Sequence, residues 1–518
     1  MAETMKERKD MDPQYMWDLS TLFKNDEEWN NALPELDEMI KKLPEYQGKL
    51  NNAKTIREFF DFDTHLGRKL SDFYCYASLR NCEDTRDSDA QAMEAKAYQV
   101  YTAYATAISF AEPEILSLDE DVLESIVHSD DLLPYAFNMQ KLLDQKPHVL
   151  SAKEEALLAA FTETLGAPSK ISESLQDADM TFESVTDSNG EVHELNQSNY
   201  ILLQMSEDRT LRLNAFKSFY KGFKEHINTF ASTYNACIKE AVAEAQVRHY
   251  ESSRAMSMAY EHVPGVVYDS LVDTVRKFMP EMYRYVRLRK QMLGLDELHY
   301  YDVYTPLVAG SSKSYTYEEA QQMVLDAVTP LGKDYVNRVK QAYKDRWIDV
   351  YPNNGKRGGA FSSGTYDSNP YILTSFTGTL DSVSTIAHEM GHSQHTWLSN
   401  HTQTPQNADY TLFVAEVAST VNENLLVEQL LQKTTEPKER LALLNHYLEG
   451  FKGTVYRQTM FAEFEKTTHE LSEKGEVLTA ELLNKKYYEI NEKYFGGEII
   501  LDKEISYEWM RIPHFYYN

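Results

Sequence analysis

The stretch His388-Glu389-Met390-Gly391-His392 is the part of the sequence around which the rest of the chain can be placed. Two residues four apart on an α-helix project from the same face, so both histidines of this stretch reach a single metal ion. The glutamate between them then points at a water molecule beside that ion. We therefore predict a helix that carries two zinc ligands, His388 and His392, and one acid–base residue, Glu389.

The sequence just before this stretch supports a helix. Asp381 or Ser382 is suited to cap its first turn, because side-chain oxygens at that position accept hydrogen bonds from free backbone N–H groups. Apolar residues then recur every three or four positions, as in a helix with one buried face. These residues are Val383, Ile386, Ala387 and Met390. The two histidines are thus expected in the middle of the helix.

A second helix is predicted over residues 409–423, and it contains Glu416 among apolar and small neighbours. A carboxylate is costly to bury without a partner, so we expect Glu416 to meet a cation. Glu416 follows His392 by 24 positions, enough for one helix to end, a loop to turn and a second helix to begin. Two histidines and one glutamate leave the fourth zinc position open, as a catalytic site requires. We predict one zinc ion per chain, held by His388, His392 and Glu416.

Several stretches together resemble the M3 (thimet oligopeptidase-like) zinc peptidases, and within them the oligoendopeptidase F branch. Residues 413–419, Phe-Val-Ala-Glu-Val-Ala-Ser, are similar to the helix with the family's third ligand, and residues 356–362, Lys-Arg-Gly-Gly-Ala-Phe-Ser, to its glycine-rich strand. Residues 15–20, Tyr-Met-Trp-Asp-Leu-Ser, resemble the branch's opening, and residues 511–517, Arg-Ile-Pro-His-Phe-Tyr-Tyr, its late substrate-contacting segment. The resemblance covers nearly the whole chain.

This resemblance implies a mainly α fold, with two helical lobes around a deep substrate channel. It also implies a gluzincin-type zinc site with a small β-sheet beside the HExxH helix. The implied activity is that of a zinc-dependent endopeptidase acting on internal peptide bonds of short oligopeptides. In it, Glu389 is the general base for a zinc-activated water. His514 with Tyr516 or Tyr517 match the family's histidine and tyrosine, which stabilise the oxyanion.

Further residues are expected near the zinc ligands. Ser419 and Glu423 are candidate hydrogen-bond partners that orient the ligating imidazoles. Gly358, Gly359, Ala360 and Phe361 are expected to lead into a strand whose free edge pairs with the backbone of an extended substrate. The alternative for this last group is a turn with no role in substrate binding. A structural role is the alternative for the late tyrosines, because the chain has 35 tyrosines.

The remaining sequence predicts two domains. Residues 1–195 form an N-terminal helical lobe that ends in a β-hairpin, whose tight turn is Asn189-Gly190. Residues 87–111 of this lobe are expected to form a long, mostly buried helix. Residues 196–518 form the catalytic domain, with a helix break at Pro280, a capping box from Thr316 to Glu319, and a small sheet from residues 347–351, 360–362 and 371–376.

Composition narrows the possible partners and compartment. The chain has 81 acidic and 52 basic residues, a net charge of -29, which argues against nucleic acids and anionic membranes as partners. An acidic surface favours cationic peptides, although it can also simply keep a protein dissolved. Three cysteines are too few for a disulfide framework, and the start of the chain lacks the apolar core of a signal peptide. A cytoplasmic location is therefore expected.

Two other functions fit the sequence less well. A zinc aminopeptidase uses the same three ligands, but its usual Gly-x-Met-Glu-Asn motif is absent. A catalytically silent peptide-binding protein is disfavoured because Glu389 and all three ligands are present. Family members usually continue for several tens of residues beyond the segment that matches residues 511–518, so we expect a truncated chain or one whose remainder is a separate polypeptide. Cleavage preference, the physiological peptide and the oligomeric state stay open.

Overall fold

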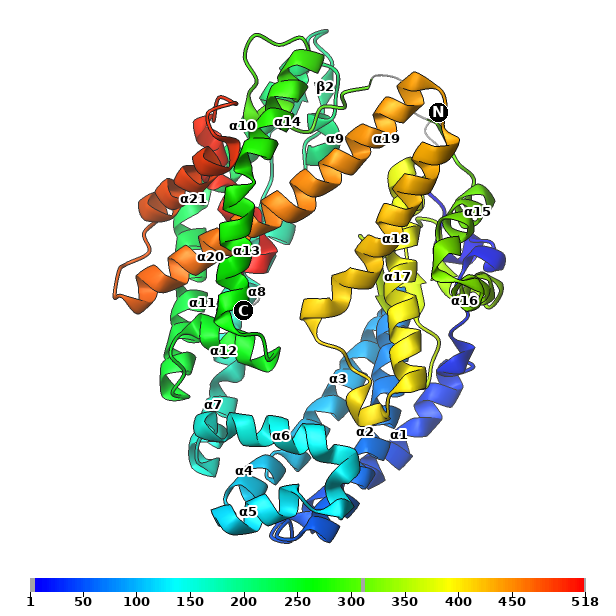
Figure 1. Ribbon diagram of the computed structural model, residues 1–518, viewed down its shortest axis with the longest axis vertical. Helices are drawn as coiled ribbons and strands as arrows, with labels where there is room; N and C mark the ends of the chain where they lie inside the picture. Colours follow the sequence, from blue (N-terminus) through cyan, green and yellow to red (C-terminus); the bar gives the residue numbers. More distant parts are fainter. Residues whose placement is uncertain (1–4, 309–312, 517–518) are drawn as a thin grey trace. The chain divides into compact units, whose positions relative to one another are not determined.

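The computed structural model describes residues 5–308 and 313–516 of a mainly helical chain (Figure 1). Two compact units can be distinguished within it. The first comprises Met1–Ala152 and Ser312–Thr435, and the second comprises Lys153–Ser311 and Glu436–Asn518. The prediction of a mainly α fold with a small sheet is confirmed. Within the described residues, no helix is long and apolar enough to span a membrane.

The first unit consists of helices from each of its two segments and a small sheet. Its helices are α1 (Asp26–Ile40), α2 (Ala53–Glu83), α3 (Ser88–Ile108), α4 (Ala111–Leu116), α5 (Glu120–Val127), α6 (Ala136–Gln145), α15 (Tyr317–Ala327), α16 (Lys333–Lys344), α17 (Leu380–Thr402) and α18 (Leu412–Lys433). Its strands are β3 (Ile348–Asp349), β4 (Phe361–Ser363) and β5 (Tyr371–Leu373).

The sheet of the first unit separates two hydrophobic clusters. Its strand order is β3-β5-β4, with β5 parallel to β3 and antiparallel to β4. Successive side chains of a strand point to opposite faces. Accordingly, Tyr371 and Leu373 pack into the cluster formed by the N-terminal helices, and Ile372 packs into the cluster beneath α17. The middle strand therefore connects the N-terminal helices to the helix with the two histidines.

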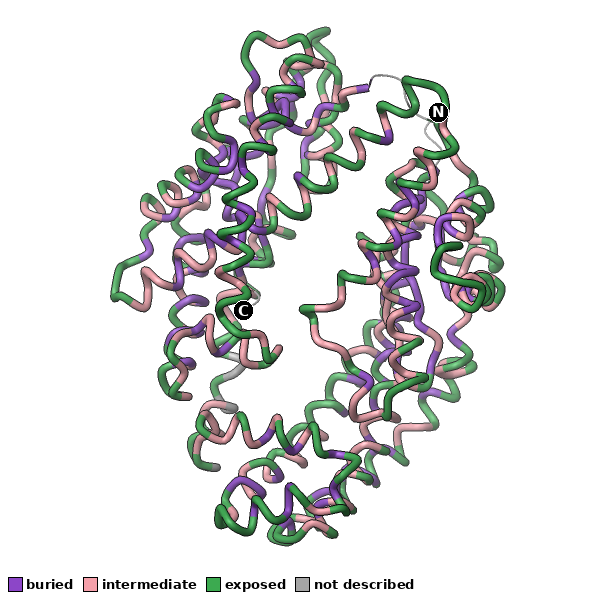
Figure 2. Tube along the Cα trace, viewed as in Figure 1, coloured by how far each residue is buried: buried purple, intermediate pink, exposed green. Residues whose placement is uncertain are grey.

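Helix α17 buries its apolar face, as its sequence pattern predicts. Val383, Ile386, Ala387 and Met390 are all fully buried against residues of α15, α16 and the sheet. Figure 2 shows the buried residues concentrated along this helix. Helix α18 lies beside α17 in the same unit (Figure 1). On the sheet side, the Ser362 and Ser393 hydroxyl oxygens lie 2.8 Å apart, so β4 directly contacts α17.

The second unit is helical apart from one hairpin. Its helices are α7 (Ala152–Leu165), whose first residue is the last of a segment of the first unit, α8 (Ala167–Ser174), α9 (Tyr200–Gln204), α10 (Arg209–Glu225), α11 (Ile227–Val247), α12 (Ser253–Tyr260), α13 (Gly265–Lys277), α14 (Met279–Met292), α19 (Pro437–Gly450), α20 (Arg457–Glu473) and α21 (Ala480–Phe495). Strands β1 (Val185–Thr186) and β2 (Val192–His193) form the predicted hairpin, and Gly190 in its turn has φ 86°. The helix break near Pro280 and the capping box of Thr316 and Glu319 are also confirmed.

Two expectations differ from the structure. Helix α3 was expected to be mostly buried, but Tyr98 is 63% and Tyr101 51% exposed. The buried residues of α3 are Ala90, Met93, Ala97 and Val100. The spacing of alanines and tyrosines marks a face of the helix, but it does not tell whether that face is buried. The compact units also do not divide near residue 195, because β5 packs against the N-terminal helices and so joins them to α17. Periodicity along a chain does not reveal which distant segments pack together.

Candidate metal centre

The two histidines of the motif lie on α17, and the helix begins slightly earlier than its sequence suggests. The Thr379 hydroxyl accepts a hydrogen bond from the Ser382 backbone N–H at 3.2 Å, so Thr379 caps the helix rather than Asp381 or Ser382. His388 and His392 follow one turn apart on the same face. Their Nε2 atoms lie 3.2 Å from each other, and their rings are nearly perpendicular, at 83°.

Glu416 of α18 completes a triangle of donor atoms with these histidines. Its Oε2 lies 3.4 Å from Nε2 of His388 and 3.5 Å from Nε2 of His392. Ligands about 2.0–2.1 Å from a tetrahedral zinc ion are about 3.3–3.4 Å from one another. The three measured separations agree with that value. The donor set therefore fits one zinc ion with an open fourth position.

The burial of Glu416 differs from the expectation. Its side chain is 63% exposed, so the prediction that Glu416 is a buried carboxylate is wrong. The apolar neighbours that suggested burial, Leu412, Phe413 and Val417, are themselves exposed. The buried residues of α18 are Ser419, Asn422, Leu426 and Val427. The helix backbone and a hydrogen bond from Ser419 therefore hold Glu416 in place, and burial among apolar side chains does not.

Each ligand candidate has a hydrogen-bond partner that fixes its orientation. Nδ1 of His388 donates to Oε1 of Glu423 at 2.6 Å. The Ala415 main-chain carbonyl accepts a hydrogen bond from the His392 ring. Ser419 donates to Oε2 of Glu416 at 2.7 Å. It was expected to orient an imidazole, and it orients this carboxylate instead. With these bonds made, the Nε2 lone pairs and one carboxylate oxygen face a shared point, where a cation relieves their mutual repulsion.

Glu389 is buried beside these donors, with its side chain turned inward from α17. It is 6% exposed, and its Oε2 is buried without a hydrogen bond to any residue that the structure describes. Burial raises the pKa of Glu389 to about 7, while the neighbouring His388 opposes the shift. A buried acceptor of this kind is costly unless something fills its hydrogen-bonding capacity. A water molecule bound at the donor triangle is suited to do so.

The close contact of α17 and α18 depends on residues that the motif itself does not explain. A Cβ atom on Gly391 would lie 2.6 Å from Cα of Ser419 and 2.7 Å from the Ala418 oxygen. The buried Asn422 amide donates to the Ala387 carbonyl at 3.1 Å, and its oxygen accepts from Tyr335. Gly391 therefore allows the helices to approach, and Asn422 sets their register.

We predict that Gly391→Ala displaces α18 and with it the Glu416 carboxylate. The clash is with backbone atoms, so it should lower the free energy of unfolding by about 1–3 kcal/mol and weaken zinc binding. Thermal unfolding with chelator and a zinc titration measure the two effects. Gly450→Ala is the matched control, because Gly450 is also helical and has open space around its Cβ position. A Gly391→Ala variant with parental stability and zinc affinity would contradict this account.

The residues expected to bind substrate lie at the start of β4. Gly358 and Gly359 are exposed, and Gly359 has φ 84°, a conformation suited to glycine. Ala360 follows, and Phe361 begins the strand and packs on the cluster of the N-terminal helices. Because the strand order is β3-β5-β4, β4 forms one edge of the sheet. Their role in substrate binding stays a prediction.

The predicted late catalytic residues belong to the second unit. His514 is exposed in the short helix Pro513–Tyr516. The Tyr516 hydroxyl lies 3.0 Å from the Thr233 hydroxyl, and burial raises the pKa of Tyr516 to about 12. Tyr517 lies outside the described residues. The structure thus brings together His388, Glu389, His392, Glu416, Ser419 and Glu423, whereas roles for His514, Tyr516 and Tyr517 stay predictions.

A second group of potential metal donors occurs at the hairpin and was missed in the sequence. It consists of Asp187, Glu191 and His193. Asp187 Oδ1 already accepts backbone N–H groups of Asn189 and Glu191, at 2.8 and 2.9 Å. Such bonds stabilise a tight turn without any ion. The zinc assignment therefore rests on the centre at α17 and α18, where a buried acid–base candidate accompanies the donors.

The chain is similar to known oligopeptidases over nearly its whole length. The model of peptidase family M3 matches residues 202–518, and that of oligopeptidase F matches residues 114–182. Oligopeptidase PepF of Bacillus subtilis is 43% identical, over 100% of this chain and 78% of that protein. Group B oligopeptidase PepB of Streptococcus agalactiae is 42% identical, over 99% of this chain and 85% of that one. The crystal structure of oligoendopeptidase-F from Enterococcus faecium has a TM-score of 0.71 and 37% identity, covering 95% and 85% of the two chains.

Proposed function

The chain belongs to peptidase family M3, and on this basis we propose that it is a zinc-dependent endopeptidase that hydrolyses internal bonds of short peptides. Membership of the family makes it a peptide hydrolase of the metallo-oligopeptidase type. The observation that carries the finer proposal is the triangle of Nε2, Nε2 and Oε2 donors at tetrahedral spacing, with the buried Glu389 beside it. Neither feature is needed for a protein that merely binds peptides.

The proposed zinc ligands are His388, His392 and Glu416. When bound, zinc supplies a Lewis acid that polarises the scissile carbonyl and lowers the pKa of a water molecule to about 7. Glu423 and the Ala415 carbonyl hold the two imidazoles in the orientation in which Nε2 of each would bind the ion. Ser419 holds the Glu416 carboxylate in the same way.

Glu389 is proposed as the general base. It accepts a proton from the attacking water and returns it to the leaving nitrogen, so no covalent intermediate with the protein forms. A base with a raised pKa is suited to both steps near neutral pH, because it can take up and release a proton. We assign the stabilisation of negative charge on the carbonyl oxygen to His514 and to Tyr516 or Tyr517, on the sequence resemblance alone.

The edge of β4 is proposed to hold the peptide backbone in an extended form. Pairing along a strand edge uses main-chain hydrogen bonds and therefore accepts varied side chains. The contact between Ser362 and Ser393 joins this strand to the helix of the proposed zinc ligands, which supports a site where a peptide paired with β4 lies beside those ligands. The proposed substrates are short peptides, because an extended, unpaired backbone is available in a flexible peptide and not in a folded protein.

We also propose that the protein works in the cytoplasm. The support is that Cys75, Cys82 and Cys237 are all free and buried. Free thiols persist in a reducing compartment.

A peptide blocked at both ends and carrying an internal fluorophore–quencher pair tests the proposed function. We expect internal cleavage that stops when a chelator is added and returns when zinc is restored in equimolar amount. A protein that cleaves only the unblocked version of the peptide would be an aminopeptidase. Efficient digestion of a stable folded protein would contradict the restriction to short peptides. Mass spectrometry of the products identifies the bond that is cut in each case.

A further inference from the structure

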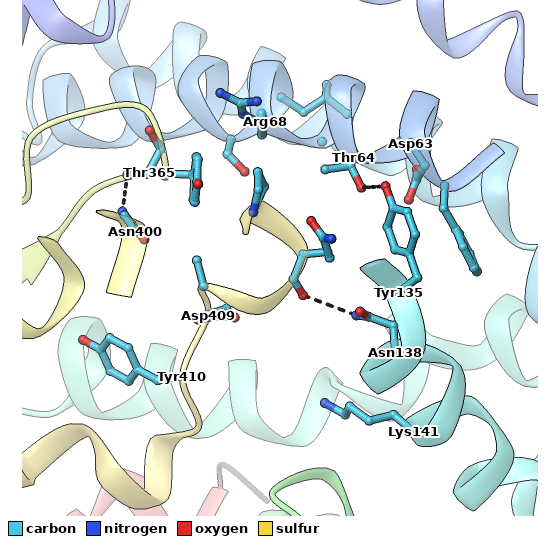
Figure 3. A pocket seen from close by; sticks show the side chains of 18 of the residues that line it. Asp63, Thr64, Arg68, Tyr135, Asn138, Lys141, Thr365, Asn400, Asp409 and Tyr410 are labelled. Carbon is cyan, nitrogen blue, oxygen red and sulfur yellow. Dashed lines mark hydrogen bonds between the residues drawn. The ribbon is translucent and has the colours of Figure 1, made fainter. Parts of the chain in front are cut away.

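A large cavity in the first unit lies beyond the metal ligands and has no role in the chemistry described above. Its volume is about 960 Å³. Residues of α2, α3 and α6 line one side, and β4 with the segment after it, α17 and the connection to α18 line the other. Figure 3 shows Asp63 and Arg68 of α2, Asn138 and Lys141 of α6, and Asp409 around this space. Polar and apolar side chains contribute about equally to its lining.

The cavity continues from the proposed substrate edge. Ser362 and Ser363 of β4 line it, and so do Thr396 and Asn400 of α17. Thr396 and Asn400 follow His392 by four and eight residues, which along a helix corresponds to about 6 and 12 Å. An extended peptide covers about 3.3 Å per residue. The cavity therefore takes groups that lie about two to four residues from the bond cut at the metal centre.

The charged groups of the cavity favour a cation. Among the described residues that line it, Asp63, Glu112 and Asp409 are acidic, and Arg68 and Lys141 are basic. Arg68 is already paired with Asp367, which does not line the cavity, through two hydrogen bonds, one of them 2.8 Å long. Apart from this pair, the lining has Asp63 and Asp409 against one basic residue, Lys141.

Two carboxylates at the cavity are held in surroundings that disfavour a negative charge without a partner. Burial raises the pKa of Asp63, and the hydrogen bond from the Tyr104 hydroxyl at 2.8 Å opposes this only in part. Asp72 lies behind the lining residue Thr365, whose hydroxyl donates to it at 2.5 Å, and burial raises the pKa of Asp72 to about 6. A cation beside either group stabilises its charged form. A carboxylate has room for several donors, and the Tyr104 hydroxyl occupies only part of that capacity at Asp63.

We propose that this cavity binds a cationic group of the peptide substrate, about two to four residues from the scissile bond, with Asp63 and Asp409 as the groups that recognise it. The cation is the free α-ammonium group or the side chain of a lysine or arginine. This inference rests on the proposed peptidase function, which it extends to a preference among substrates. The strongly acidic net charge of -29 works in the same direction, because it attracts cationic peptides to the protein at long range.

Matched peptides test the proposal. One pair differs only in a free or acetylated amino terminus, and further pairs carry lysine or norleucine at single positions on either side of the cleaved bond. We expect the parent protein to prefer the cationic member of at least one pair on the order of tenfold in kcat/KM, mainly through KM. The amino-terminal and lysine pairs separate the two sources of the cation. The same pairs are titrated by calorimetry into the protein kept free of zinc by a chelator, which measures binding without turnover.

Asp63→Asn and Asp409→Asn should each reduce this preference to about twofold or less, since each removes one charge from the cavity. Glu58→Gln is the matched control, because Glu58 is an exposed carboxylate on α2 that does not line the cavity, and it should keep the full preference. Asp409 is exposed, so its variant keeps the test valid should Asp63→Asn fail to fold. Equal use of both members of every pair by the parent, or an undiminished preference in the folded variants, would overturn the proposal. Tighter binding of cationic peptides without cleavage of any would support the cavity and contradict the proposed function.

Discussion

Replacing Glu389 by glutamine is expected to leave zinc bound and to lower kcat for peptide hydrolysis by a factor on the order of a thousand. Glutamine has nearly the same volume, so the buried site of a side chain that is 6% exposed stays filled. The variant retains the donor atoms of His388, His392 and Glu416. What it loses is a group whose pKa burial raises to about 7 and whose Oε2 takes no hydrogen bond within the described residues.

The measurements are zinc content per chain and kcat on one internally quenched peptide. Asp381→Asn is the control, because Asp381 is the acidic residue in the first turn of the same helix and is exposed. It should leave both quantities close to those of the parent. If Glu389→Gln cleaved peptide at nearly the parental rate with its zinc in place, another group would have to be the base.

Replacing Glu416 by glutamine should have the largest effect on zinc affinity. Its carboxylate oxygen is one of three donors that converge within 3.5 Å of one another, and a neutral amide oxygen is a much weaker zinc ligand. Glu423→Gln removes a partner of His388 and not a ligand, so we expect a decrease of about 10- to 100-fold. The decrease for Glu416→Gln should exceed that range, and activity at limiting zinc should fall with it.

Competition with a chromophoric zinc chelator measures the three affinities on one scale. Glu428→Gln, an exposed carboxylate further along α18, is the control for the loss of one negative charge on this helix. Equal zinc affinity of Glu416→Gln and the parent would place the third ligand elsewhere in the chain. A larger effect of Glu423→Gln than of Glu416→Gln would exchange the roles of the two glutamates.

The local features of the chain could be predicted because each depends on neighbouring residues. The helix of the two histidines, the hairpin at Asn189-Gly190, the capping box at Thr316 and the short strands before α17 all follow from spacing, turn residues or caps within a few positions. The pairing of His388 and His392 could also be predicted locally, because a separation of four residues places both rings on one face of a helix. The second helix with Glu416 was found through an acidic residue in an apolar setting.

Other features depend on contacts between distant segments, which leave no local signal. Tyr98 and Tyr101 have helical spacing but face solvent, and Glu416 is exposed despite its apolar neighbours. Neither the partner of Ser419 nor the bond from Asn422 to the Ala387 carbonyl follows from the sequence of either helix alone. Gly391 gave the clearest missed signal: a glycine in the middle of a helix often marks the close approach of another backbone.

Strand β5 has a consequence for the energetics of peptide capture. Its three side chains are fully buried, two in one hydrophobic cluster and one in the other, and it carries β4 along its length. If β4 pairs with a peptide as we propose, an edge strand supported in this way has its binding conformation before the peptide arrives. The conformational entropy lost on pairing is then mainly that of the peptide, and the template loses little. Longer peptides, which have more freedom to lose, gain from this rigidity only where they make further contacts beyond the strand.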